Sequence, residues 1–513
     1  MRLKNLLFFG SAVVATGILA FSSFPAGVPG EWEWGRHAPL LSRVDRWLLP
    51  AIAALVVAGI GLSVDRQFRR WGVIRRTTAV LLLVPLSGIW LSLVQLSTPA
   101  EYLLLRDSWV LYDPGSSGYF HKAVYGMEPV DEFLASYESL VNEGDVLHIG
   151  THPPGLFLVS QWAIQLCHDS PELTKLLLPG PEVRDAFNQL RSLSGHGRAL
   201  QPAEWAGLQL IGLLTRAGAS LTVIPITLLV GQLFGAQSAW RVGVLWCTLP
   251  CLAVFLPKSD VFFTFTSATA VLLYVMSIGR GGRLWLAVPC GVIIWLGMLL
   301  SLAHVTLLAL FATCCGIIFL ADRTNVRPLA ALGIVCGSIA VCSAVFTTVS
   351  DCNLFAVWKQ NLSNHAGFYD RFPRTWWKWL IVNPIELACA IGLPVSIAVV
   401  SGARRTLTPY RLTDDTSEEP SGSHRMATVV LTSAFITWGV LWLSGKNQGE
   451  AARLWCFLTP WILIATGGLW NSDEDQKAQQ KYTEFPYGWL LVSQLVCAIF
   501  TVGSICGFDA LQP

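Results

Sequence analysis

Charged residues are scarce in this sequence. Asp, Glu, Lys and Arg supply 13% of its 513 residues, against roughly 25% in an ordinary soluble domain. The 35 basic and 33 acidic residues almost cancel, so the chain lacks the basic surplus that binding to nucleic acid requires. The composition therefore excludes a typical water-soluble domain and argues against nucleic acid as a partner.

Paired metal-binding or disulfide-forming cysteines are also lacking. The 13 cysteines include no CxxC pair and no Cys/His spacing typical of a metal site. Many of them lie inside apolar runs, where a thiol behaves as a small hydrophobic side chain: Cys247, Cys251, Cys290, Cys314, Cys315, Cys336, Cys342 and Cys497. No carboxylate pair has an obvious ligand spacing either, so we expect neither a metal ion nor a cofactor.

Long hydrophobic runs dominate the chain instead. Hydrophobic residues make up 53% of it, and its mean hydropathy is +0.52. Because a helix needs about 20 apolar residues to cross a bilayer, we expect about thirteen spans. They lie near residues 3–24, 47–63, 77–96, 206–234, 238–256, 261–279, 284–302, 304–321, 328–349, 380–401, 426–445, 454–470 and 487–506. The sequence therefore predicts an all-α polytopic membrane protein.

The first of these runs allows a second interpretation. Arg2 and Lys4 precede it, as basic residues precede the apolar part of a signal peptide. The run is long, however, and no clear small-x-small cleavage site follows it. We interpret it as a span.

The runs divide the chain into five parts. We expect three N-terminal spans in 1–96, a large exoplasmic loop in 97–205, a central membrane bundle in 206–349, a second exoplasmic loop in 350–379 and the C-terminal spans in 380–513. Within the large loop, the apolar piece 156–166 is too short to cross a bilayer and fits a juxtamembrane helix at the interface.

Arginine-rich connectors predict the orientation. Lys and Arg near span ends stay on the cytoplasmic side, and such residues gather in four connectors, near 66–76, 280–283, 323–327 and 404–425. With thirteen spans and a cytoplasmic N-terminus, all four connectors share one face. We expect a multi-pass protein of a bacterial inner membrane whose active site is on the periplasmic side.

The remaining polar residues gather on the opposite, exoplasmic face. They are Asp107, Asp113, His148, His152, Lys258, Asp260, His304, the loop 350–379, Lys446, Glu450 and Arg453. Any one of them could simply cap a helix or anchor it at the lipid headgroups. Because charge near a bilayer is costly unless it is paired or solvated, their shared face predicts a common aqueous cavity.

Several short motifs at these positions resemble those of a known family. The segment Tyr112–Ala123, followed by His152-Pro153-Pro154-Gly155, is similar to the first exoplasmic loop of GT-C membrane glycosyltransferases, especially the protein O-mannosyltransferase and lipid A aminoarabinose transferase group. Three later segments strengthen the resemblance: Pro257–Asp260, Arg374–Trp379 leading to Asn383-Pro384, and Gly449–Trp455 before Pro460. The resemblance covers most of the chain in architecture and only these motifs in residues.

The resemblance implies site residues, with two departures. Asp113 is our candidate base, with Asp107 behind it, although the family usually has two adjacent carboxylates; Gly155 also replaces the usual leucine. A lipid phosphate leaving group calls for cations and hydrogen-bond donors. The candidates for binding the donor phosphate and substrate are Tyr119, His152, Lys258, Asp260, Arg374, Lys446, Glu450 and Arg453.

One candidate pair can be argued from spacing alone. Arg453 lies three residues after Glu450, so a helix would place both on one face, where the carboxylate could orient the guanidinium. The alternative is an ion pair at the interface with little consequence. By contrast, the acceptor-like triplet Asn361-Leu362-Ser363 matches the glycosylation pattern, which we attribute to chance.

Three functions compete. A glycosyltransferase would move a sugar from a polyprenyl-phosphate donor in the lipid bilayer to the hydroxyl of an unidentified glycan, lipid or protein acceptor. A transporter or flippase would place ionisable groups midway through broken helices, whereas here they lie at span ends. A lipid-oligosaccharide ligase or polymerase would have its large loop late in the chain, whereas this loop is early. The first function fits best.

Overall fold

The computed structural model is helical almost throughout. It describes residues 2–23, 25–37, 45–127, 129–279, 281–408, 422–470 and 486–508. Parts of two arginine-rich connectors, at 280 and 409–421, lie outside these residues. The helices of the first half are α1 (Arg2–Phe21), α2 (Leu48–Phe68), α3 (Val73–Val94), η2 (Gln95–Ser97), α4 (Ala100–Tyr112), α5 (Tyr119–Tyr125), α6 (Val130–Asn142), α7 (Gly155–Asp169), α8 (Pro171–Leu177), α9 (Pro181–Leu193), α10 (Pro202–Leu221), α11 (Val223–Phe234) and α12 (Ala236–Cys247).

The second half continues the helical pattern. Its helices are α13 (Pro250–Phe255), α14 (Ser259–Ile278), η3 (Leu284–Leu286), α15 (Ala287–Leu300), η4 (Leu302–His304), α16 (Val305–Ala321), α17 (Arg327–Ser350), α18 (Leu354–Ala366), α19 (Phe368–Arg371), α20 (Trp376–Ile391), α21 (Leu393–Leu407), α22 (Gly422–Leu443), α23 (Ala451–Leu454), η5 (Cys456–Leu458), α24 (Thr459–Leu463), η6 (Ile464–Trp470) and α26 (Tyr487–Ser504). The described strands form two short antiparallel pairs, β1 (Gly27–Val28) with β2 (Trp32–Glu33) and β3 (Gly35–Arg36) with β4 (Ile505–Cys506).

Many of these helices can cross a membrane. Among the described residues, nine helical segments are long and apolar enough, and a tenth candidate is the pair α20–α21, which bends by 106°. Three more apolar helices, Phe9–Phe21, Leu284–Leu300 and Cys456–Trp470, are shorter. The predicted all-α, multi-span architecture is confirmed. The predicted number of about thirteen spans is not, because three of the expected segments form helices too short to qualify.

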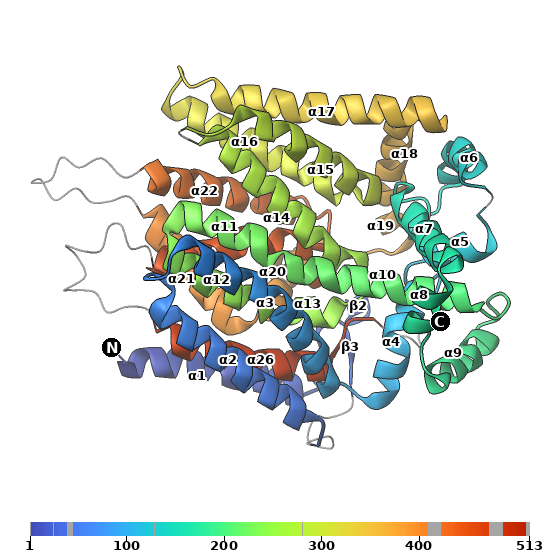
Figure 1. Cartoon of the computed structure of the whole chain (residues 1–513), viewed down its shortest axis with the longest axis horizontal. Coiled ribbons are helices and arrows are strands. Elements are labelled where there is room, and N and C mark those ends of the chain that lie inside the picture. Colours follow the sequence, from blue (N-terminus) through green and yellow to red (C-terminus); the bar gives the residue numbers. More distant parts are fainter. Residues whose placement is uncertain are drawn as a thin grey trace, which may run out of the picture.

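The long helices lie side by side, and the helices from 97–205 cover one end of them. Figure 1 shows α4 to α9 at the right-hand end, together with α18 and α19. The turns between α2 and α3, between α14 and α15, and between α16 and α17 lie at the opposite end, where α1 begins. The described residues of the connectors near 66–76, 280–283 and 323–327 therefore lie at the opposite end of the bundle from the helical cap formed by α4 to α9.

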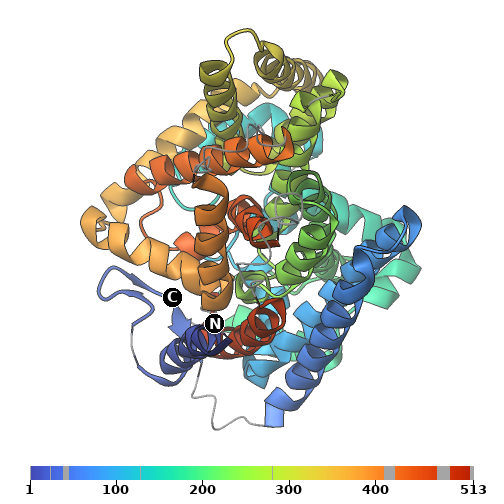
Figure 2. The ribbon, with the colours of Figure 1, turned by 90° about the vertical axis from the view of Figure 1, so that its left-hand side faces the viewer.

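The buried centre of the bundle is the segment Ala236–Phe255. Its most apolar window is wholly buried, whereas α2, α3 and α17 expose large apolar side chains, as lipid-facing helices do. Figure 2 shows the bundle from its left-hand end, with α1 beside α26 at one edge. Cys336 on α17 is exposed, contrary to the expectation of burial, because that helix has an outward face.

Local sequence signals explain where key helices begin. Pro202 occupies the first turn of α10, and the side chain of Glu204 accepts a hydrogen bond from the backbone N–H of Gln201 in a capping box. The side chain of Asn353 accepts hydrogen bonds from Phe355 and Ala356 at the start of α18. Lys258 is the N-cap of α14, so the chain enters this span with a cation at its outer end.

Candidate functional site

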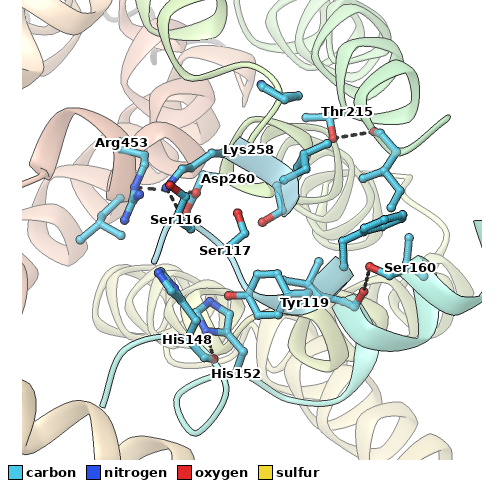
Figure 3. Close-up of a pocket in the computed structure, with 18 residues that line it drawn as sticks. Ser116, Ser117, Tyr119, His148, His152, Ser160, Thr215, Lys258, Asp260 and Arg453 are labelled. Atoms are coloured by element: carbon cyan, nitrogen blue, oxygen red, sulfur yellow. Dashed lines mark hydrogen bonds and ion pairs between the residues drawn. The ribbon is translucent and has the colours of Figure 1, made fainter. Parts of the chain in front are cut away.

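A cavity lies where the helical cap meets the bundle. It has a volume of about 90 Å³, and Figure 3 shows the side chains that surround it. They come from the end of α4 and the turn after it, α5, the loop before α7, α7 itself, α10, the start of α14 with the residues just before it, and α23. The lining residues are Leu111, Ser116, Ser117, Tyr119, Phe120, His148, His152, Leu156, Val159, Ser160, Ile211, Thr215, Pro257, Lys258, Ser259, Asp260, Arg453 and Leu454.

A tight turn after α4 forms one wall. The carbonyl of Asp113 accepts hydrogen bonds from the N–H groups of Ser116, Ser117 and Gly118, and Gly118 adopts a left-handed φ of 77°, which favours glycine. The hydroxyl of Ser117 donates to the carbonyl of Val110 at 2.7 Å. The turn thereby places two serines at the cavity.

Lys258 is a buried cation at this turn. Its side-chain amine, Nζ, donates to the carbonyl of Ser116 at 2.9 Å, and the residue is 7% exposed. Burial, followed by the repulsion of Arg453, lowers the pKa of Lys258 to about 7. Because no carboxylate forms an ion pair with it within the described ranges, its charge remains available to an anionic ligand.

Arg453 is the second cation of the cavity, with a side chain that is 12% exposed. Its Nη2 donates to Glu450 Oε2 at 2.7 Å, with Arg453 and Glu450 three residues apart. Its Nε lies 3.9 Å from Asp260 Oδ2 and forms no hydrogen bond to another described residue. The expected contact between Glu450 and Arg453 is confirmed. Glu450 has a left-handed φ of 55°, an unusual conformation for a residue with a side chain.

The two histidines of the cavity lie on a loop fixed by Asp145. The carboxylate of Asp145 accepts hydrogen bonds from four successive N–H groups, those of Leu147, His148, Ile149 and Gly150. These bonds lower the pKa of Asp145 against the opposing effect of its burial. The loop therefore has one defined conformation before α7 begins.

Side chains from two other helices hold the same loop. Asn361 on α18 donates through Nδ2 to the carbonyls of Gly150 at 2.7 Å and His152 at 3.2 Å. The hydroxyl of Tyr137 on α6 donates to the carbonyl of His152 at 2.8 Å. Asn361 is fully buried, consistent with our reading of its glycosylation triplet as a chance match.

Each histidine ring makes one contact with a backbone carbonyl. His148 Nε2 is 3.0 Å from the carbonyl oxygen of Gly115, and His152 Nδ1 is 3.1 Å from that of His148. Burial is the main cause that lowers the pKa of His148 to about 3 and that of His152 to about 4. Both imidazoles are therefore neutral at pH 7.

The glycine of the HPPG motif lies against the bundle. A Cβ at Gly155 would lie 2.4 Å from the backbone oxygen of Leu299, at the end of α15. The leucine usual at this point of the glycosyltransferase motif that the sequence resembles cannot fit here without moving that helix. Tyr119, on α5, packs its ring edge-on against that of His152, with centroids 5.2 Å apart.

Tyr119, His152, Lys258, Asp260 and Arg453 therefore share this cavity, and Glu450 binds one of them. The two candidate bases lie outside the lining. Asp113 Oδ1 is 3.7 Å from His196 Nε2, and the carboxylate of Asp107 is bound by Arg106 at 2.9 Å and Arg216 at 3.4 Å. Asp107 is thus already neutralised by two guanidinium groups, whereas Asp113 begins the turn that carries Ser116 and Ser117.

Arg374 and Lys446 also lie outside the cavity lining. The guanidinium of Arg374 donates to the carbonyl of Gln448 and lies 5.3 Å from the ring centroid of Trp32, with further rings of Phe368 and Trp379 around it. Lys446 is exposed on the neighbouring loop. Arg374 therefore organises the loop before Glu450 and does not contact the cavity.

Sequence reasoning missed several residues that build the site. Ser116 and Ser117 lacked any distinguishing signal beyond their place in a turn. Asp145 follows a glycine, a common start for a loop that an acidic side chain organises, and could have been found. Asn361 could not, because its partners are more than two hundred residues away in the sequence.

Metal ligands do not gather at this site or elsewhere in the described chain. No group of three or more His, Cys, Asp or Glu residues in that part of the chain could hold a metal ion.

Comparisons with known proteins give a distant likeness in structure only. No family model matches the chain, and no curated protein matches it. A crystal structure of the Archaeoglobus fulgidus oligosaccharyltransferase tethered to an acceptor peptide with the NVT sequon is similar with a TM-score of 0.40 and 11% identity, over 79% of this chain and 55% of that one. The same enzyme in complex with Zn and sulfate gives a TM-score of 0.43 and 12% identity, over 82% and 53%.

The chain spans about half the length of these solved structures. At such identities and scores, the likeness says nothing about the substrate of this protein.

Proposed function

We propose that this protein is a GT-C-type membrane glycosyltransferase that moves a sugar from a polyprenyl-phosphate donor to an acceptor hydroxyl on the exoplasmic face. The observation that carries the proposal is a pair of largely enclosed cations, Lys258, 7% exposed, and Arg453, with a side chain 12% exposed, beside one cavity at the end of a multi-span bundle. A donor with a lipid tail and a charged phosphate needs a site of this kind.

The two cations suit a phosphate that gains charge as it leaves. When the bond between the anomeric carbon and the phosphate oxygen breaks, the oxygen keeps the electron pair and the phosphate becomes more negative. Fixed cations in a site screened from water stabilise that charge strongly. Lys258 and the unbonded Nε of Arg453 are the groups we assign to it, while Glu450 and Asp260 hold the guanidinium in place.

The acceptor must lose a proton in the same step. Its hydroxyl oxygen bonds to the anomeric carbon, and the proton passes to a carboxylate acting as general base. We assign this role to Asp113, because it begins the turn whose Ser116 and Ser117 line the cavity. Asp107 is the weaker candidate, because Arg106 and Arg216 occupy its carboxylate.

The test is a donor panel with the purified full chain in lipid nanodiscs. Incubation with polyprenyl phosphates that carry different sugars should release free polyprenyl phosphate for one of them. Asp113→Asn should reduce this release by about a hundredfold or more, whereas Asp131→Asn, an exposed carboxylate of the same segment, should leave it unchanged. No release with any donor would contradict the proposal.

One feature favours a second candidate, a transporter. The broken pair α20–α21, with its 106° bend, is of a kind that transporters use to form substrate sites at mid-membrane. The cavity cations, however, lie at helix ends, Lys258 before α14 and Arg453 in the short α23. Uptake of a sugar lipid into vesicles without release of polyprenyl phosphate would favour the transporter.

A further inference from the structure

We propose that Nε2 of His152 accepts a hydrogen bond from a substrate hydroxyl in the cavity and does not bind the donor phosphate. The proposal rests on the proposed function and names the kind of group that this side of the cavity recognises. It also changes the role that the sequence suggested for His152.

The partners of Nδ1 determine which ring nitrogen carries the proton. Nδ1 lies 3.1 Å from the carbonyl oxygen of His148, and a carbonyl oxygen can only accept a hydrogen bond. Nδ1 must therefore carry hydrogen. The hydroxyl of Thr151, also 3.1 Å away, donates its own hydrogen to the carbonyl of Leu147 at 2.6 Å, so its oxygen is an acceptor for the same Nδ1–H group.

Nε2 is then the acceptor of the neutral ring. It forms no hydrogen bond with another described residue. It is also not closed off from its surroundings, in contrast to the buried polar atoms of the described chain that lack a partner. His152 lines the cavity, and Figure 3 shows its ring beside those of His148 and Tyr119, with its contact directed to the loop backbone. A lone pair therefore remains for a ligand.

The backbone of His152 is held in place, so the position of the ring relative to the His148 carbonyl is defined. Its carbonyl accepts from both Tyr137 and Asn361. Asn364 adds a hydrogen bond from Nδ2 to the carbonyl of Gly150 at 2.9 Å. Reversing the ring about the Cβ–Cγ bond would place Cδ2 at the position of Nδ1, and the ring would lose its hydrogen bond to the carbonyl of His148.

The surroundings keep the ring neutral, so it cannot serve as a phosphate-binding cation. Burial lowers the pKa of His152, and the nearby Arg453 and His365 add to the effect, while the contact with the His148 carbonyl opposes it. Lys258 and Arg453 already supply the positive charge of the cavity. A neutral nitrogen lone pair would repel a phosphate oxygen, which is also an acceptor.

The complementary group is a hydroxyl. A polyprenyl phosphate sugar has hydroxyls only on its sugar, and the acceptor brings its own. The two sources share the chemistry that Nε2 recognises, and ligands with and without the sugar separate them.

The experiment compares two ligands and two substitutions. Binding of polyprenyl phosphate, and of the same lipid carrying the sugar that the donor panel selects, is measured in nanodiscs for the wild-type chain, His152→Phe and His152→Gln. Phenylalanine keeps the ring shape but has no acceptor, whereas glutamine can place an amide oxygen near the former Nε2. His168→Phe, at a largely exposed histidine of α7, is the matched control.

We expect His152→Phe to weaken binding of the sugar lipid by about three- to tenfold, as for loss of one hydrogen bond, with polyprenyl phosphate unaffected and glutamine restoring part of the loss. If the hydroxyl belongs to the acceptor, both binding constants stay unchanged and the acceptor KM rises instead. Equal weakening of both lipids would show a phosphate contact and overturn the proposal, as would no change in binding or in KM. Failure of the wild-type chain to bind either lipid would instead contradict the proposed function.

Discussion

Arg241 and Arg453, at opposite ends of the bundle, differ in how completely carboxylates compensate the charge of their guanidinium groups. Arg241 donates to both oxygens of Asp65, at 2.7 and 2.9 Å, and the rings of Trp470 and Tyr487 lie 5.2 Å from its guanidinium. Arg453 has one short contact, to Glu450, a distant one to Asp260, and a second cation, Lys258, nearby.

The difference separates a charge that stabilises the fold from charges that can bind a ligand. A bidentate pair with aromatic walls uses the geometry of both partners. At the cavity, the amine of Lys258 donates one hydrogen bond to a described residue, the carbonyl of Ser116, and Arg453 Nε has no hydrogen bond within the described chain. Unused donor capacity beside a cavity, more than burial alone, is the feature on which our proposal of a ligand site at this end rests.

The largest effect should follow loss of the cavity cation. Lys258→Met should lower the rate of polyprenyl phosphate release by about a hundred- to a thousandfold, because one fixed donor to a developing oxyanion has about that effect. Release is measured under saturating donor, beside thermal unfolding. An unchanged rate would show that Lys258 is a structural cation like Arg241.

Loss of the Asp65 carboxylate, which pairs with Arg241 at the end away from the cavity, should lower stability and leave binding of polyprenyl phosphate unchanged. Asp65→Asn leaves the buried Arg241 facing a neutral amide and should lower the free energy of unfolding by about 3 kcal/mol. Thermal unfolding and binding of polyprenyl phosphate are measured together. If binding falls while the unfolding temperature stays constant, the contrast between the two ends fails.

A smaller effect concerns pH. Lys258 has a pKa lowered to about 7, so in the free protein it is charged below that pH and neutral above it. Binding of polyprenyl phosphate should therefore weaken as the pH rises above 7, by up to about tenfold. Lys258→Arg should remove this dependence, because arginine stays charged. The same slope in both proteins would place the titrating group elsewhere.

The smallest effect should come from a substitution at Glu31, in the N-terminal segment, and should concern the unfolding temperature. Glu31 accepts hydrogen bonds from Thr375, Lys378 and Trp379. Burial alone would raise the pKa of Glu31, but these bonds lower it from 4.5 to about 2. Its stabilising effect is complete above 4.5 and is lost as the pH falls toward 2. Glu31→Gln should therefore unfold at a lower temperature than wild type at pH 6, with the gap narrowing at pH 3; a constant gap would contradict this.

The sequence predicted the membrane architecture because hydropathy reports it directly. Every expected span coincides with helical residues in the structure. The bend between α20 and α21 was not predicted, although Gly392-Leu393-Pro394 lies at the break. Hydropathy averages over a window, so it does not register a change of direction within an apolar run.

The site was predictable where the relevant neighbours are close in sequence. The i,i+3 spacing of Glu450 and Arg453 was enough to predict their contact. The contact between Asp107 and Arg216 was not foreseen, because Arg216 belongs to α10 and lies 109 residues away. Which ring nitrogen of His152 carries the proton could not be predicted from the sequence either, because it depends on the direction of the His148 carbonyl in the folded loop.

Gly155 limits how this protein can be engineered. A Gly155→Leu substitution, copied from the glycosyltransferases that the motif resembles, would bring a side chain into contact with the backbone of Leu299. Either α15 or the loop that carries His148 and His152 would have to shift outward to make room. Importing that leucine should therefore be tolerated only with compensating changes along α15.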